Sequence, residues 1–379
     1  MRVLHLFSNA KYTGPAEPAL NLCVSLRKLG IEADLAFPDL PAGVPHTLRD
    51  VSRDRGIEPI LRFRLNKHRN PFSNFLDGIA MNRYLNEHPY DLIHCHLDND
   101  HRLGIGVARR HGIPVVRSSY AGEGFQNPAR HARLLEGTAR LLEPSRQALE
   151  HDAETYSFPM ESMQVVPGAV DVERFDPVRE VPDGRKWLGI PPDAFVVGIV
   201  ARMQTHRRYE DFFGAIRRLV DAGRNAHAIV VGRGTFQEQV GKQPVQNLGL
   251  TDRVHFPGYV AGENYVGMVK AFSVKVFLVP GSDGTCRAVR EAMAMGKPAV
   301  VSSRGMLPEI VDHGVNGLVC DGSPEGLYEA LNMLSGDRAR EREMGRAARR
   351  KAEEAFALPV QAAQVAGVYR ELMNESRSG

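Results

Sequence analysis

Short apolar runs alternate along the chain with longer stretches in which apolar residues recur at helical spacing. The runs are RVLHLF, ADLAF, DLIHCH, PVVRSS, LLEPS and MQVVP in the first half, and FVVGIVA, HAIVVG, VHFPGYV, VKVFLVP, PAVVSS and GLVC in the second. They are continuously apolar, which is typical of parallel strands that helices cover on both faces. The pattern predicts an α/β protein with two doubly wound, Rossmann-like domains.

A segment rich in proline and glycine, PGAVDVERFDPVREVPDGRKWLGIPPD, separates the two sets of runs. Turn-forming residues at this density indicate a linker. We therefore expect an N-terminal domain over residues 1–167 and a C-terminal domain over residues 168–358. Two domains are also the usual arrangement for a chain of 379 residues. Residues 359–379 are predicted to form a helix that packs back toward the N-terminal domain.

Composition excludes several classes of protein. The chain has 43% apolar and 25% charged residues, and its formal net charge of +3 is too small to favour general binding of nucleic acid. Its four cysteines form no C-x-x-C pair, which indicates reduced thiols and neither a disulfide framework nor a zinc site. Apolar runs stay well short of the roughly 20 residues that span a bilayer. The N-terminus lacks the features of a signal peptide. We expect a cytoplasmic protein.

Ligands of doubly wound domains bind at the carboxyl ends of the strands, so the residues after each strand are informative. After RVLHLF, the turn formed by Thr13, Gly14 and Pro15 leads into a helix predicted from about Glu17 to Leu29. Backbone N–H groups at a helix start favour an anion. An ordinary turn without a ligand is the alternative for this segment alone.

The second domain has two further candidate segments. Arg202 follows the strand FVVGIVA directly, with Arg207 close behind, and arginines there could hold phosphate oxygens in bidentate contacts or could simply be solvated. In GSDGTCRAVREAMAMGKPAVV, a turn from Gly281 to Cys286 leads into a helix that carries Glu291. A carboxylate beside a phosphate site suits sugar hydroxyls. These segments indicate a site for a nucleoside diphosphate that bears a sugar, with a hydrolase using paired carboxylates as the alternative.

Three motifs in the same order and spacing resemble those of the retaining glycosyltransferases of the two-domain GT-B fold, family 4, also called glycosyl transferases group 1. DGTCRAVREAMAMGKPAV resembles E-G-F-G-x-x-x-x-E-A-M-A-x-G-x-P-V-V, ARMQTHRR resembles G-R-L-x-x-x-K-G, and VVPGAVDVERFDP resembles V-I-P-N-G-V-D-x-x-x-F-x-P. The resemblance covers nearly the whole chain and implies two domains that face each other across a cleft.

The resemblance implies a role for each matching residue. Glu291 would bind the ribose, Arg202 and Arg207 the diphosphate, and Asp283 the transferred sugar. Donor contacts would also come from the two loops at Gly14 and at Gly284, Thr285 and Cys286, where Cys286 replaces a glycine. In such retaining enzymes the leaving phosphate is thought to accept the proton of the acceptor, so neither a carboxylate base nor a metal or other cofactor is expected.

Two departures from the family pattern concern the sugar. Asp283 stands where a glutamate is common and is one methylene shorter. Tyr120 stands where the family often has a histidine, and a phenol can donate a hydrogen bond but carries no positive charge. Either Tyr120 makes the contact in neutral form, or Arg117 supplies the charge, or activity is weak or absent.

Two further groups of residues could have either a functional role or a purely structural one. His94 and His96 could chelate a metal with Asp98, but we expect no metal, since the family often has histidines here without one. Basic residues interleave with aromatic ones in the segment before the third strand. This pattern suits contact with an anionic membrane surface or a lipid-phosphate acceptor. An ordinary exposed loop and helix could show the same pattern. The basic residues are Arg62, Arg64, Lys67 and Arg69, and the aromatic ones Phe63, Phe72 and Phe75.

The resemblance implies an enzyme that moves a sugar from a nucleotide-sugar donor to a glycan or lipid-linked acceptor, in the synthesis of cell-envelope polysaccharide or lipopolysaccharide. The N-terminal domain would receive the acceptor and the C-terminal domain the donor. The enzyme would be cytoplasmic or peripheral on the inner face of the membrane. The alternatives are a GT-B relative with epimerase or phosphorylase activity and a catalytically silent nucleotide-binding subunit.

Overall fold

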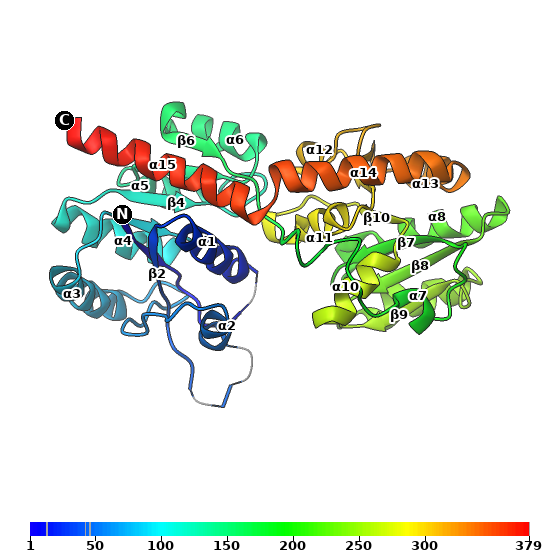
Figure 1. The fold of residues 1–379 in the computed structure, drawn as a ribbon, viewed down its shortest axis with the longest axis horizontal. Coiled ribbons are helices and arrows are strands. Elements are labelled where there is room, and N and C mark those ends of the chain that lie inside the picture. The colour runs from blue at the N-terminus through cyan, green and yellow to red at the C-terminus, as the bar shows by residue number, and fades with distance from the viewer. Residues whose placement is uncertain (13, 42, 45–46, 379) are drawn as a thin grey trace. The chain divides into compact units, whose positions relative to one another are not determined.

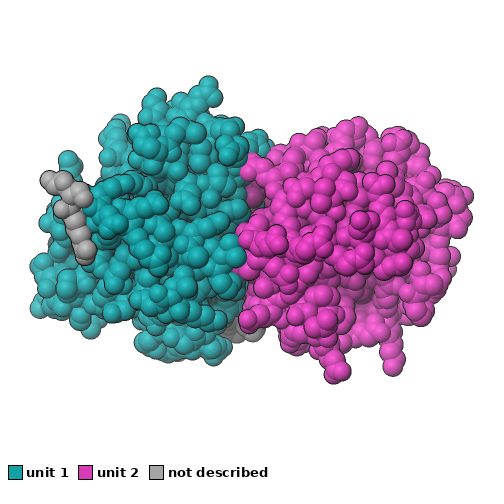
Figure 2. Space-filling model, turned by 45° about the horizontal axis from the view of Figure 1, so that its top comes forward, with its two compact units in different colours: residues 1–168, 282–284, 358–379 teal, residues 169–281, 285–357 magenta. Residues whose placement is uncertain are grey.

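The computed structural model describes residues 1–12, 14–41, 43–44 and 47–378, except for the side chains of residues 283, 285 and 376–378. The chain forms two compact units (Figure 1, Figure 2). Unit 1 comprises residues 1–168, 282–284 and 358–379, and unit 2 comprises residues 169–281 and 285–357. Each contains a six-stranded sheet, and the strand pairs in both sheets are parallel. The predicted α/β class with two doubly wound sheets is confirmed.

Unit 1 has the strand order β2-β1-β3-β4-β5-β6. Its strands are β1 (Arg2–Leu6), β2 (Glu32–Ala36), β3 (Leu92–Cys95), β4 (Val115–Ser118), β5 (Arg140–Glu143) and β6 (Met163–Val165). Its helices are α1 (Ala16–Lys28), α2 (Leu48–Asp54), α3 (Pro71–Glu87), α4 (Asp98–His111), α5 (Pro128–Leu135), α6 (Arg146–Tyr156) and α15 (Leu358–Ser378), with a short 3-10 turn at Met160–Ser162.

Alternation along the strands of unit 1 sends side chains into two separate cores. Val3 packs on one face with residues of α1 and of the C-terminal helix α15, and Tyr369 of α15 is fully buried there. Leu4 and Leu6 pack on the other face with residues of α3 and α4. Because both faces are covered, most positions along the strands are apolar, as their sequence pattern indicated.

Unit 2 has the strand order β12-β11-β10-β7-β8-β9. Its strands are β7 (Phe195–Val200), β8 (Ala226–Val231), β9 (Val254–Gly258), β10 (Val274–Phe277), β11 (Ala299–Ser302) and β12 (Gly317–Cys320). Its helices are α7 (Gly184–Trp187), α8 (Tyr209–Asp221), α9 (Gln243–Asn247), α10 (Gly262–Ala271), α11 (Asp283–Ala294), α12 (Leu307–Ile310), α13 (Pro324–Gly336) and α14 (Arg338–Ala355), with a 3-10 turn at Thr205–Arg207 and a π-helical turn at Glu238–Lys242.

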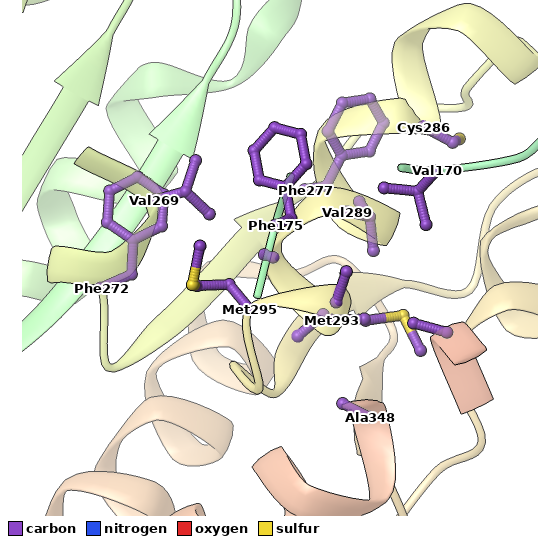
Figure 3. Packing of buried hydrophobic residues seen from close by; sticks show 14 of the residues in the cluster. Val170, Phe175, Val269, Phe272, Phe277, Cys286, Val289, Met293, Met295 and Ala348 are labelled. Carbon is purple, nitrogen blue, oxygen red and sulfur yellow. The ribbon is translucent and has the colours of Figure 1, made fainter. Parts of the chain in front are cut away.

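Helix α11 begins earlier than the sequence suggested. The segment from Gly281 to Cys286 was predicted to be a turn, whereas the helix starts at Asp283. Cys286 is fully buried and lies on α11 with Val289 and Met293 in one apolar core cluster (Figure 3). These positions are three and four residues apart, so the buried stripe of the helix already includes Cys286. Cys286, which replaces a glycine of the family pattern, therefore belongs to a helix and to the core.

We predict that Gly198 at the centre of β7 cannot accept a side chain. A Cβ at this position would lie 2.4 Å from Cγ of Phe272, which directly follows α10. Gly198→Ala should lower the free energy of unfolding by about 1–3 kcal/mol in denaturant titrations, because overpacking displaces the ring. Phe272→Leu should cost less in the Gly198→Ala background than in the wild type.

The matched control for this prediction is Gly214→Ala on α8, where no described atom lies within 4 Å of the added Cβ. This change should leave the stability unchanged or raise it by up to about 1 kcal/mol, since alanine is the better helix former. Equal unfolding midpoints for both alanine variants would contradict the close contact at Gly198.

Candidate functional site

Arg202 and Arg207 follow β7 at its carboxyl end. Arg202 is exposed and has no hydrogen bond or ion pair among the described residues, and Arg207 ends the 3-10 turn. The loop after β8 packs closely against the segment that carries Arg202. A Cβ on Gly232 would lie 2.2 Å from the carbonyl oxygen of Ala201, and Gly232 has a φ of +139°. Glycine is therefore required at position 232. The close contact between the two loops supports the segment beside Arg202.

Glu291 lies on the first half of α11 and is 6% exposed. The hydroxyl of Tyr265 on α10 donates a hydrogen bond to Oε2, and Nε of Arg287 lies 3.4 Å from Oε1. Arg287 is one helical turn before Glu291, which places the two side chains on one face. Carboxylate oxygens accept hydrogen bonds from hydroxyl groups, which is the chemistry that the hydroxyls of a sugar need.

Lys275 on β10 is fully buried and connects these segments electrostatically. Its ammonium donates to the carbonyl oxygen of Val276 at 2.7 Å. Burial lowers the pKa of Lys275 to about 7, while Glu291 raises it and Arg207 lowers it further. Arg207 and Glu291 come from different elements, and the tertiary structure brings both near one buried amine. Sequence reasoning missed Lys275, although a lysine inside the apolar run VKVFLVP was a visible signal.

Gly284 lies in the first turn of α11. No described atom lies within 4 Å of the position that a Cβ on Gly284 would take. The side chains of Asp283 and Thr285 lie outside the described part of the chain. Because the thiol of Cys286 belongs to the core, the predicted donor contact of this residue is reduced to its backbone.

In unit 1, Gly14 precedes α1 with a φ of +50°. Pro15 is the N-cap residue, and among the described residues no side chain caps its helix start. Thr13, the third member of the predicted turn, lies outside the described residues. The helix begins at Ala16, close to the predicted Glu17. The start of α1 remains a candidate anion site.

Tyr120 follows β4 and is bonded to a chain of buried histidines. Its hydroxyl lies 2.7 Å from Nδ1 of His96, and Nε2 of His96 lies 3.0 Å from Nδ1 of His5. His96 follows β3 and His5 lies on β1. Burial lowers the pKa of both histidines, that of His5 to about 3, so both rings are neutral. Sequence reasoning missed His5, which lies in the apolar run RVLHLF.

His94 completes a cluster of three histidines whose ligand atoms lie within 4.8 Å of one another. Nδ1 of His94 is bonded to the hydroxyl of Tyr369, and Nε2 lies 2.8 Å from Oγ of Ser118. Among the described residues, the only ring nitrogen of the cluster without a hydrogen-bond partner is Nε2 of His5. Hydrogen bonds account for this arrangement, because a metal ion would need three nitrogens that no other group engages.

Asp98 and Arg117 have partners of their own in unit 1. Arg117 is 4% exposed, and its Nη2 lies 3.2 Å from Oδ1 of Asp98, which also contacts Arg130 and His131. These ion pairs and the basic neighbours hold the pKa of Asp98 well below its usual range, against the opposing effect of burial. Asp98 is therefore not a partner of the histidine pair, and the positive charge of Arg117 is directed to an internal carboxylate.

A cavity of about 20 Å³ in unit 1 lies beside Tyr120 and is also lined by Ser118, Ser119 and Gln361. This volume is enough for about one water molecule and not for a sugar. The four basic residues predicted before α3 are all exposed, whereas Phe63 between them is buried. These basic residues are Arg62, Arg64, Lys67 and Arg69.

Comparisons with known proteins agree for both halves of the chain. The family model described as Glycosyltransferase Family 4 matches residues 14–174, and the model described as Glycosyl transferases group 1 matches residues 181–351. An uncharacterized glycosyltransferase of Methanocaldococcus jannaschii is 25% identical over 264 residues, which are 65% of this chain and 67% of that protein.

A D-inositol 3-phosphate glycosyltransferase of Streptomyces avermitilis is 26% identical over 312 residues, which are 76% of this chain and 67% of that protein. Among solved structures, Anabaena HepE in complex with UDP has a TM-score of 0.80 at 19% identity and covers 98% of this chain and 100% of its own. The structural likeness shows that the two chains share a fold.

The buried histidines predict a specific dependence of stability on pH. The pKa of His5 is about 3 in the folded protein and about 6.5 in the unfolded chain, so as pH falls through 6.5 only the unfolded chain gains a proton and stability is lost. His5→Phe removes this loss. Between about pH 7.5 and about pH 5.5, the stability of the variant relative to the wild type should rise by about 1.4 kcal/mol.

The measurement is denaturant unfolding at both pH values, with His68→Asn at an exposed position as the control. The control should show no such change relative to the wild type. A pH-independent difference between His5→Phe and the wild type would show that folding does not shift the pKa of His5.

The orphaned nitrogen of His5 also predicts where the protons lie in the chain that ends at Tyr120. A buried N–H without an acceptor is the rarer defect, so Nε2 of His5 should be unprotonated and its proton should lie on Nδ1. His5 then donates to Nε2 of His96, and Nδ1 of His96 carries a proton that it donates to the Tyr120 oxygen. The hydroxyl hydrogen of Tyr120 is thereby directed to a partner other than His96.

Correlation spectra of ¹⁵N-labelled histidine side chains test this assignment, with single histidine variants to identify the signals. We expect His5 and His96 to be protonated at Nδ1. Spectra in which both carry the proton at Nε2 would reverse the predicted direction of the chain.

Proposed function

We propose the reaction of this protein from one premise: the chain belongs to the GT-B glycosyltransferases of family 4, because two family models match residues 14–174 and 181–351. The reaction moves a sugar from a nucleotide-sugar donor to a glycan or lipid-linked acceptor. It retains the anomeric configuration and needs no metal ion. Unit 2 binds the donor and unit 1 receives the acceptor.

The arrangement around Lys275 is the observation that carries the donor site. Arg207 and Glu291 both influence the pKa of this buried amine, so a cation suited to phosphate and a carboxylate suited to hydroxyls both lie in its surroundings in unit 2. Arg202 and the first N–H groups of α11 add further groups that suit a diphosphate. Anabaena HepE was solved with UDP, which makes UDP the first nucleotide to test.

The charge that develops on the leaving diphosphate determines how these residues accelerate transfer. Arg202 and Arg207 are positive before the donor arrives, and fixed cations that already point toward a developing negative charge lower the barrier. The leaving phosphate itself takes the proton of the acceptor hydroxyl. Asp283 holds hydroxyls of the transferred sugar, and this contact strengthens in the transition state.

Tyr120 contacts the sugar or the phosphate in neutral form. It lies at the carboxyl end of β4, and the hydrogen bond from the neutral His96 holds its oxygen in place. Arg117 does not replace it, since its charge is directed to Asp98 within unit 1. We further propose that the acceptor belongs to cell-envelope polysaccharide or lipopolysaccharide synthesis, and that Arg62, Arg64, Lys67 and Arg69 form the basic surface on the acceptor side.

Calorimetry with UDP, GDP and ADP identifies the nucleotide and tests the donor residues. Arg202→Ala, Arg207→Ala and Glu291→Gln should each weaken binding of the cognate nucleoside diphosphate about tenfold or more, since charge-assisted hydrogen bonds contribute about 1.5–3 kcal/mol. Asp283→Asn should leave this affinity unchanged and lower turnover with the full donor, because it contacts only the sugar.

Arg342→Ala on α14 is the matched control, since it removes an exposed arginine elsewhere in unit 2 and should not change binding. Unimpaired binding by Glu291→Gln together with both arginine variants would refute the donor site. Unimpaired binding by Glu291→Gln and a loss of turnover in both acid variants would favour a hydrolase with paired carboxylates.

A further inference from the structure

Over its first turns, helix α3 exposes apolar side chains and buries polar ones. Phe72, Phe75 and Ile79 are 71%, 66% and 51% exposed, and their spacing of three and four residues places them on one face of the helix. Ser73 and Asp77 are buried on the opposite face. A helix on a soluble domain normally buries its apolar stripe, so three large exposed apolar side chains on one face mark an interaction surface.

The buried polar residues of α3 hold the basic segment that precedes it. The carboxylate of Asp77 accepts hydrogen bonds from the backbone N–H groups of Arg64 and Leu65, each at 2.9 Å. Oγ of Ser73 accepts one from Asn66 at 2.7 Å. Leu65 has a φ of +36°, a strained conformation for a leucine, and these contacts enforce it. The basic segment is therefore fixed against α3 and does not trail freely in solvent.

Positive charge surrounds the apolar face. Arg62, Arg64, Lys67 and Arg69 are exposed in the segment before α3. The pKa of Arg102 on α4 is lowered by burial and then by the charges of Arg69, Arg130 and Arg133, so arginines of α4 and α5 add to the positive charge near Arg69. Asp98 compensates part of this charge through Arg130. We call the four basic residues before α3, together with Phe72, Phe75 and Ile79, the α3 surface.

The α3 surface is tied to the edge of the sheet where the proposed chemistry of unit 1 lies. The side chain of Asn74 on α3 donates to that of Asn99 on α4 at 2.8 Å, and Asn99 donates to the carbonyl oxygen of Asn66 at 2.7 Å. Helix α4 starts directly after β3 and packs beside α3 (Figure 1). The start of α3 is therefore near the carboxyl end of β3, the edge at which His96 and Tyr120 lie.

We propose that the α3 surface docks unit 1 on an anionic lipid bilayer. Phe72, Phe75 and Ile79 enter the boundary between head groups and acyl chains, and the surrounding arginines and lysine contact lipid phosphates. Apolar side chains within a basic border complement such a surface in both polarity and charge. Among the described residues, no helix combines the length and apolar character that crossing a bilayer requires.

The inference deepens the proposed function and rests on it in one respect: a lipid-linked acceptor lies in the bilayer that the α3 surface contacts. Docking by this surface turns the carboxyl edge of the unit 1 sheet toward the head groups, where the sugar-accepting end of such a lipid is found. The membrane thereby restricts the acceptor to the side of the protein that carries Tyr120.

Co-sedimentation with vesicles tests the proposal on the full-length protein without donor or acceptor. The wild type should bind vesicles of phosphatidylglycerol and phosphatidylcholine, bind pure phosphatidylcholine far more weakly, and lose much of its binding at high salt. Phe72→Ser combined with Phe75→Ser should weaken binding to the anionic vesicles at least tenfold. Replacement of the four basic residues by serine should remove the preference for anionic lipid.

Trp187→Ser removes an exposed aromatic residue of unit 2 and should bind vesicles like the wild type. Depth is tested by fluorescence in the variant Trp187→Phe with Phe75→Trp, whose single tryptophan should show a blue-shifted emission on anionic vesicles. Thermal unfolding checks that each variant is folded. Equal vesicle binding by the wild type and the double phenylalanine variant, or an unshifted emission, would overturn the proposal, and absence of vesicle binding would leave a protein as the occupant.

The outcome is separable from that of the donor site. Nucleoside diphosphate affinity in solution should be the same for the wild type and the double phenylalanine variant. A protein that binds the nucleotide and ignores vesicles would refute only the membrane surface, and one that binds vesicles and no nucleotide would refute only the donor site.

Discussion

A parallel sheet that is covered on both faces has no contact with water along its strands, so each polar side chain inside it needs a partner from the protein. Clusters in both units follow this constraint, although Nε2 of His5 and the carboxylate oxygens of Glu143 have no hydrogen-bond partner among the described residues. In unit 1 the histidines of β1 and β3 bond to one another and to hydroxyl groups, and burial keeps them neutral. In unit 2 the ammonium of Lys275 bonds to a backbone carbonyl and lies near the charges of Glu291 and Arg207. These polar groups thus form small, connected clusters.

The same constraint places the remaining chemistry at the ends of the strands. There the backbone leaves the sheet, helix starts expose N–H groups, and glycines allow loops to approach each other closely. Arg202 follows β7, Tyr120 follows β4, and α11 starts soon after β10. The polar clusters inside the sheets extend to these ends. His96 is hydrogen-bonded to Tyr120, and the charge of Arg207 lowers the pKa of Lys275. The buried histidines thereby hold the hydroxyl of Tyr120 in place.

Helix α3 is the place where the usual segregation of polar and apolar residues is reversed. Asp77 is buried because it satisfies two backbone N–H groups of a strained segment, while Phe72 and Phe75 remain exposed. Because the buried carboxylate of Asp77 accepts hydrogen bonds from the basic segment, the conformation of that segment is under constraint. A surface that is apolar in its centre and basic at its border differs from the mixed charges on the outside of unit 2, such as α14.

The sequence by itself determined the fold class, because continuous apolar runs and their turn residues are local signals that both sheets reproduce, and ordered motifs with their spacing determined the family. It did not reveal that Cys286 belongs to a helix and to the core, since a run of small and polar residues is compatible with either a turn or a helix start. Only the tertiary structure joined His5 to His96 and Lys275 to Glu291, because these partners lie on different elements and meet through strand pairing and helix packing. It also decided which face of α3 is buried, since hydrogen bonds to a neighbouring segment outweighed the apolar pattern that would have buried Phe72 and Phe75.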